Sequence, residues 1–149
     1  MSLLDRVLSH LADKKVASAL IGGLALAAHG ISRATEDIDL LVLDREVLAE
    51  GFWDWEESAE VEIRRGDLDD PLAGVVRIWG SDEVVDLVVG REPWMKGVLK
   101  QRLEIQMGPR VLSVVPRADL VLLKLFAGGP QDLLDIELLL AADAGGLKA

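Results

Sequence analysis

Residues 21–42 read IGGLALAAHGISRATEDIDLLV, and the fold of the chain can be predicted outward from this stretch. The apolar residues 16–21 lead into it and indicate a short buried strand. Gly22-Gly23 then predicts a turn, residues 24–29 a helix that Gly30 ends, and residues 37–43 a strand that starts polar and becomes buried. The stretch therefore predicts a strand–turn–helix–loop–strand unit.

The rest of the chain adds helices and strands around this unit. Apolar residues at helical spacing predict an amphipathic helix over residues 2–14, and Asp44 is a candidate cap for a helix that ends near Glu50. The other expected strands are 59–65, 75–79, 84–89, 103–107 and 111–115, with a hairpin turn at 80–83, and the other expected helices are 92–101, 116–126 and 131–142.

This order predicts an α/β (α+β) fold with a mixed β-sheet flanked by helices. We expect a single domain over residues 1–149, with a core at about 15–91 and C-terminal helices at about 116–142.

Composition excludes several classes of site. The 149 residues contain no cysteine, which rules out disulfides, thiolate zinc sites and cysteine nucleophiles. The net charge of −10 argues against broad, nonspecific binding of nucleic acid. We find no secretion signal and no apolar run of about 18 residues, so we expect a cytoplasmic protein without a membrane span.

Aspartates form the main candidate site. Asp37 and Asp39 share one face of their predicted strand, and Asp86 interrupts the apolar run 84–89. Like charges this close need a positive partner, and Mg²⁺ or Mn²⁺ prefers oxygen ligands. If the two strands are neighbours, Asp86 completes a cluster of carboxylates. The alternatives are solvated acids at a strand end and, for Asp86, an ion pair with Arg77.

Gly22-Gly23 lies between the predicted strand and the predicted helix, and because glycine has no side chain the backbone there can approach a ligand closely. A strand, a glycine turn and a helix N-terminus together make a phosphate-binding arrangement. The alternative is a tight turn without a ligand. The Walker A and Rossmann spacings are both absent.

Taken together, residues 21–42 resemble the nucleotidyltransferase superfamily related to DNA polymerase β, and most of all its abortive-infection type toxins. The shared features are the Gly-Gly, a helix ending in Gly, Arg33-x-Thr35, and Asp37-Ile38-Asp39. The resemblance implies a mixed sheet flanked by helices. It also implies transfer of a nucleoside monophosphate from a nucleoside triphosphate, ATP among them, to a hydroxyl acceptor, with release of pyrophosphate.

The resemblance also implies roles for individual residues. Asp37, Asp39 and Asp86 would be the catalytic metal ligands, and Asp86 would bind the metal that activates the acceptor hydroxyl. The nucleotide-binding residues would be Gly22, Gly23, Arg33, Thr35 and Lys124. The alternative role for Arg33 is a surface salt bridge. The alternative for Lys124 is a position on a core helix, from which its amino group extends to the surface. Gln131 stands where the relatives carry a second lysine.

Two other functions stay open at this point. One is a nucleotide-binding or regulatory module of the same fold without turnover, and the other is a metal-dependent glycosyltransferase-like site. Candidate partners are the nucleoside triphosphate, an acceptor (a tRNA, a protein or a small molecule), and an antitoxin or a second copy of the chain.

Overall fold

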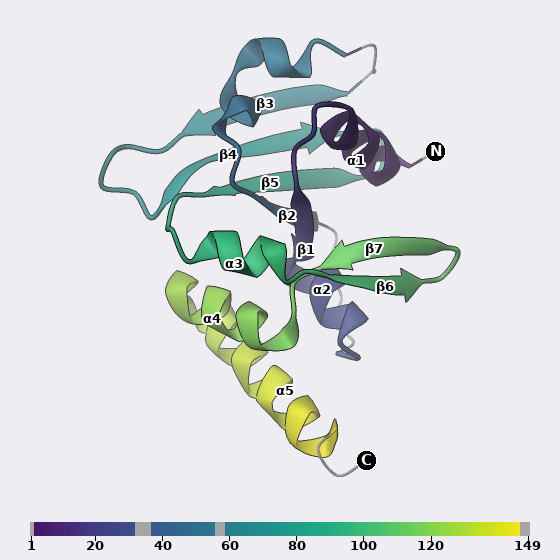
Figure 1. The fold of residues 1–149 in the computed structure, drawn as a ribbon, viewed down its shortest axis with the longest axis vertical. Coiled ribbons are helices and arrows are strands. Elements are labelled where there is room, and N and C mark those ends of the chain that lie inside the picture. Colours follow the sequence, from purple (N-terminus) through teal and green to yellow (C-terminus); the bar gives the residue numbers. More distant parts are fainter. Residues whose placement is uncertain (1, 32–36, 56–58, 147–149) are drawn as a thin grey trace.

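A computed structural model of the protein describes residues 2–31, 37–55 and 59–146. Its elements follow the predicted order closely (Figure 1). The helices are α1 (Leu3–Asp13), α2 (Gly22–Ala28), α3 (Met95–Lys100), α4 (Arg117–Ala127) and α5 (Pro130–Gly146). The strands are β1 (Ser18–Ile21), β2 (Asp37–Val42), β3 (Glu60–Arg65), β4 (Leu72–Trp79), β5 (Val84–Gly90), β6 (Leu103–Met107) and β7 (Arg110–Val114).

Within the described residues, these strands form one sheet in the order β3-β4-β5-β2-β1-β7-β6. The pairs β2–β5 and β1–β7 are parallel and the other neighbours are antiparallel, so the sheet is mixed and the predicted fold class is confirmed. The predicted hairpin 75–89 is the β4–β5 pair. Strands β6 and β7 extend the sheet beyond β1, outside residues 15–91.

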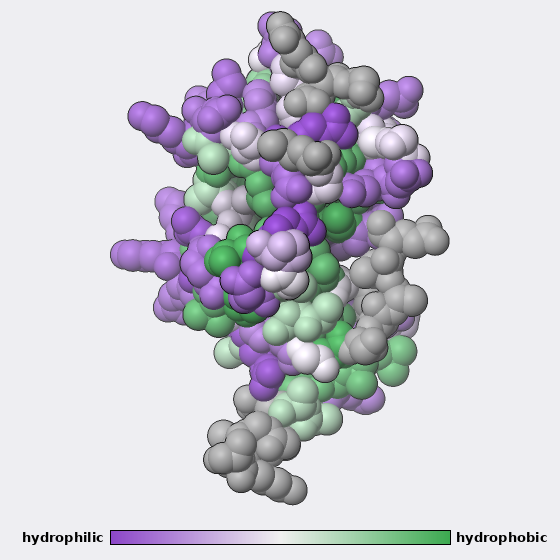
Figure 2. Space-filling model, turned by 90° about the vertical axis from the view of Figure 1, so that its right-hand side faces the viewer, coloured by the Kyte–Doolittle hydropathy of each residue, from purple (hydrophilic) through white to green (hydrophobic). Residues whose placement is uncertain are grey.

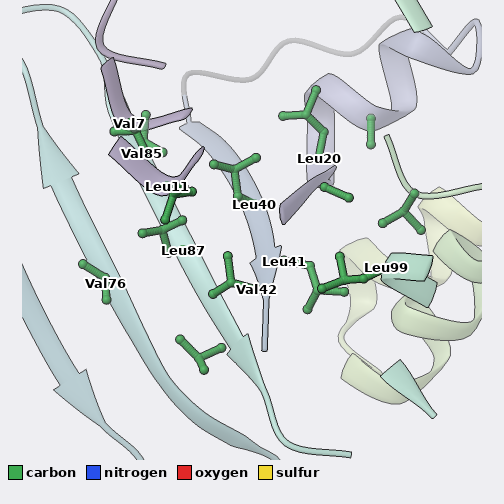
Figure 3. Close-up of a cluster of buried hydrophobic side chains, with 14 of the residues drawn as sticks. Val7, Leu11, Leu20, Leu40, Leu41, Val42, Val76, Val85, Leu87 and Leu99 are labelled. Atoms are coloured by element: carbon green, nitrogen blue, oxygen red, sulfur yellow. The ribbon is translucent and has the colours of Figure 1, made fainter. Parts of the chain in front are cut away.

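Helix α1 covers one face of the sheet because its apolar stripe is buried against it. The helix starts with a capping box, in which the Ser2 hydroxyl accepts from the Asp5 amide and the Asp5 carboxylate accepts from the Ser2 amide. Figure 3 shows Leu11 of α1 near Leu40 and Leu87, and Leu41 near Leu99 of α3 on the other side of β2. The central strands therefore bury side chains on both faces.

The predicted helix after Asp44 is wrong in type. The chain instead forms two short 3₁₀ turns, η1 (Arg45–Leu48) and η2 (Glu50–Trp53). Asp44 does cap the first turn, by accepting from the Glu46 amide at 2.9 Å. Buried apolar side chains lie in both turns, and the Trp53 indole donates to the Val47 carbonyl at 2.7 Å. This packing, rather than helix propensity, fixes the backbone there.

Helices α4 and α5 pack on each other at the end of the molecule remote from β3 (Figure 1). They leave leucines at the surface, and Figure 2 shows apolar surface in this lower part of the molecule. Among the described residues, no helix has the length and apolar character needed to cross a membrane.

Candidate active site

Two of the three predicted carboxylates lie directly opposite each other on neighbouring strands. Asp39 of β2 is in register with Asp86 of the parallel strand β5. Asp37 precedes Asp39 on the same face of β2, because side chains alternate along a strand. The adjacency expected from the sequence is therefore present in the fold, on the face of the sheet opposite α1.

Asp86 already has a cationic partner. Arg77 of β4 lies opposite Asp86 in the sheet and donates from Nε to Oδ1 and from Nη2 to Oδ2, both at 2.8 Å. Its Nη2 also lies 3.7 Å from Oδ2 of Asp37. The ion pair that the sequence left open as an alternative thus exists, and it sits inside the carboxylate cluster. This pairing raises the pKa of Arg77.

The negative charge of Asp39 is unfavourable in this environment. Burial, followed by the charges of Asp86 and Asp37, raises the pKa of Asp39 to about 6. The positive charges of Lys124 and Arg77 oppose this shift without cancelling it. The ionised carboxylate at this position therefore favours a further cation.

The position of the Asp39 side chain leaves room only for a glycine at residue 22. The residue has a φ of +73°, which L side chains rarely adopt, and a Cβ atom there would collide with Oδ2 of Asp39. The predicted reason for this glycine was close approach to a phosphate, and the structure shows close approach to a carboxylate. Gly23 is buried inside α2, which begins at Gly22 rather than at Leu24.

A cavity of about 470 Å³ opens beside Asp39, between the sheet and the C-terminal helices. Its polar lining comes from Gly22, Asp39, Lys124 and Asp132. The remaining lining is apolar and comes from Ile21, Leu41, Pro71, Leu72, Val88, Met95, Leu120, Leu123, Phe126 and Ala127. Sequence reasoning missed these apolar residues, since nothing in their spacing separates a cavity wall from a core.

Lys124 lies in this wall and joins α4 to α5. Its Nζ is 2.7 Å from Oδ2 of Asp135 and 3.5 Å from Oδ1 of Asp132. Asp135 is fully buried, and the Gln131 amide donates to its other oxygen at 3.1 Å. Lys124 is thus a largely buried cation, with its side chain 11% exposed and paired with two aspartates of α5.

The remaining predicted nucleotide-binding residues, Arg33 and Thr35, lie outside the described residues. Among the residues that are described, no three acidic or histidine side chains converge on one point as a metal site. Arg77 contacts both oxygens of Asp86. The candidate ligands Asp37, Asp39 and Asp86 offer only carboxylate oxygens, which are the ligands that a hard divalent cation prefers.

Comparison with known proteins shows the family of the chain. The family model described as "Nucleotidyl transferase AbiEii toxin, Type IV TA system" matches residues 2–148. No curated protein matches the chain significantly in sequence.

Several solved structures share the fold. The chain is similar to the antibiotic-resistance factor ANT(2'')-Ia in complex with adenylyl-2''-tobramycin, with a TM-score of 0.58, 17% identity, and coverage of 98% of this chain and 90% of that one. A candidate nucleotidyltransferase from Thermotoga maritima gives a TM-score of 0.63, 16% identity, and coverage of 93% and 91%. The lincosamide antibiotic adenylyltransferase LnuA, bound to lincomycin, gives a TM-score of 0.55 and 15% identity, with coverage of 93% of this chain and 95% of that one.

These neighbours are too distant in sequence to show more than the fold. The family match, by contrast, spans nearly the whole chain and includes the Gly-Gly turn and the aspartate strand. The chain therefore belongs to the AbiEii family of nucleotidyltransferase toxins of type IV toxin–antitoxin systems.

Proposed function

We propose that this protein transfers a nucleoside monophosphate from a nucleoside triphosphate to a hydroxyl acceptor, with release of pyrophosphate, and that the reaction depends on Mg²⁺ or Mn²⁺. The observation that supports this most is the register of Asp39 with Asp86, next to Asp37, together with the cavity that Asp39 lines. Nucleotidyl transfer in general follows from the family, whereas the metal dependence and the residue roles are our proposal.

Asp37 and Asp39 are proposed to hold the metal ions, and Asp86 to hold the ion on the acceptor side. Bound there, divalent cations would neutralise the charge of the triphosphate and stabilise the attacking and leaving oxygens. Asp86 is also proposed to accept the proton of the acceptor hydroxyl, directly or through water. The ionised form of Asp39 is disfavoured without a cation, so a divalent ion bound there would stabilise it.

The triphosphate is proposed to enter the cavity between the sheet and α4. Gly22 lines this cavity, Gly23 follows it as a buried residue of α2, and Lys124 provides a positive charge in the wall. Arg33 and Thr35 precede β2 in the sequence, so the same proposal places them on the phosphates. The apolar remainder of the cavity suits a nucleoside better than a second anion.

A regulatory module that binds nucleotide without turnover is the second candidate. Two observations favour it: Arg77 takes both oxygens of Asp86, and Gln131 replaces an expected lysine. Pyrophosphate release distinguishes the two functions, because a module would bind triphosphate and release none.

The test is an assay of pyrophosphate release from each nucleoside triphosphate with Mg²⁺, in the presence of tRNA, protein or small-molecule acceptors. We expect release that chelation abolishes and that Asp37→Ala and Asp39→Ala each reduce by about 100-fold or more. Asp69→Asn, an exposed acid in the β3–β4 loop, is the matched control and should retain full activity. Retained turnover in both aspartate variants would refute the proposed site.

The family also bears on partners. A type IV toxin–antitoxin family predicts an antitoxin, and we propose that this protein acts in the cytoplasm with such a partner. The acceptor class is left to the assay above.

A further inference from the structure

Arg77 stands in a row of charged residues that crosses four neighbouring strands. Glu62 of β3 is in register with Arg77 of β4, Arg77 with Asp86 of β5, and Asp86 with Asp39 of β2. All of these side chains lie on one face of the sheet, because residues in register point the same way. Arg77 therefore has a carboxylate neighbour on each side, Asp86 toward the cluster and Glu62 away from it.

The contacts of Arg77 are one-sided. Its guanidinium holds both oxygens of Asp86, a side chain that is only 10% exposed, and reaches toward Asp37 at 3.7 Å. Glu62 is instead paired with the exposed Arg64, from Nε to Oε1 at 2.7 Å. An exposed pair of this kind is held weakly, so Glu62 is available to a second guanidinium.

Arg77 also has space to move. Its side chain is 45% exposed, and it borders a shallow hollow of about 220 Å³ lined by Glu62, Arg64, Val75, Arg77 and Trp79. The hollow lies over β3 and β4, on the side of Asp86 opposite the larger cavity. A rotation of the side chain toward Glu62 would place the guanidinium over this hollow and leave both Asp86 oxygens free.

We infer that Arg77 is a resident cation of the carboxylate cluster, which a divalent ion must displace from Asp86 toward Glu62 before the site is complete. An arginine cannot be discharged by losing a proton near neutral pH, so it can leave Asp86 only by moving. This inference rests on the proposed function, since it takes Asp86 to be a metal ligand.

Two consequences follow with opposite signs. Arg77 stabilises the metal-free protein, because without it Asp86 would be a buried charge opposite Asp39 with no cation. Arg77 also weakens metal binding, because its bidentate pairing with Asp86 is lost when the ion enters. Glu62 strengthens metal binding, since it receives the displaced guanidinium.

The test is titration of the purified, full-length chain with Mn²⁺ alone, by calorimetry and by electron paramagnetic resonance, together with its melting temperature. We expect Arg77→Gln to melt lower than wild type without metal, and to bind Mn²⁺ about tenfold more tightly, as loss of one charge-assisted pairing from the competing state predicts. Glu62→Gln should bind Mn²⁺ a few-fold more weakly. Arg77→Lys, which keeps the charge but loses the bidentate geometry, should lie between wild type and Arg77→Gln.

Arg45→Gln is the control for net charge, because Arg45 is exposed on η1, away from this row. It should bind Mn²⁺ as the wild type does. Mn²⁺ binding that is unchanged or weaker in both Arg77 variants, with wild type binding normally, would overturn the inference and leave the proposed function standing. Absence of Mn²⁺ binding in wild type, with or without nucleoside triphosphate, would overturn both. If Arg77→Gln does not fold, Arg77→Lys and Glu62→Gln decide the question.

Discussion

Asp39→Asn should make the metal-free protein more stable near neutral pH. Burial and the charges of Asp86 and Asp37 raise the pKa of Asp39 from 3.8 to about 6. Raising a carboxyl pKa by that amount means that the ionised form is disfavoured in the folded protein by about 3 kcal/mol, taking 1.36 kcal/mol for each pH unit. An asparagine of the same shape removes that charge, so this value is the upper limit of the gain.

The sign of the pH dependence follows from the same shift. Between pH 3.8 and about 6 the folded protein keeps the Asp39 proton where the unfolded chain has released it. This group therefore contributes a stability that decreases as the pH rises through that window and is constant above it. The advantage of Asp39→Asn over wild type should be small near about pH 4 and full at about pH 8.

Chemical denaturation with guanidinium chloride across this pH range, in the presence of a chelator, measures the effect. Asp69→Asn removes an exposed loop charge and serves as the control, with a change expected within about 0.5 kcal/mol. Mg²⁺ should raise the stability of wild type and leave Asp39→Asn unaffected. A variant that is less stable than wild type at about pH 8 would refute the argument that Asp39 is an uncompensated charge.

Two further substitutions test residues next to the site. Gly22→Ala should lower the free energy of unfolding by about 1–3 kcal/mol and weaken Mn²⁺ binding, because the new methyl group meets Asp39. Gly97→Ala in α3 is the control: its methyl group meets no atom, so denaturant titration should find it neutral or slightly stabilising. Lys124→Met should destabilise the fold by about 3–5 kcal/mol, since the buried Asp135 would lose the ammonium group of Lys124, and adding Asp135→Asn should restore a large part of that loss in the same assay. A Lys124→Met variant as stable as wild type would show that the pair does not hold α4 to α5.

The fold could be predicted largely because the local signals agree with one another. The apolar runs in 37–43 and 84–89 predicted the strands that carry Asp37, Asp39 and Asp86, and the glycines marked where helix α2 joins them. The expected proximity of Asp39 and Asp86 required only that the two strands be neighbours, and β2 and β5 are. The predicted residue roles await the experiments above.

Other features depend on contacts that a single sequence does not reveal. The sequence allowed Arg77 and a metal as alternative partners of Asp86, but only the strand order shows Arg77 between Asp86 and Glu62. The turns after Asp44 follow from the burial of Phe52 and Trp53, which long-range packing decides. The cavity wall likewise comes from side chains on distant segments, so its composition has no local signature.

The parallel alignment of β2 with β5 makes the proposed site depend on the same strand register as the core. A slip of one residue between these strands would turn Asp86 toward the apolar layer under α1 and bring Leu87 out beside Asp39. Such a misaligned chain would lose both its apolar packing under α1 and the alignment of Asp39 with Asp86. Molecules with this shifted register should therefore be less stable than correctly folded ones, because they bury Asp86 and expose Leu87.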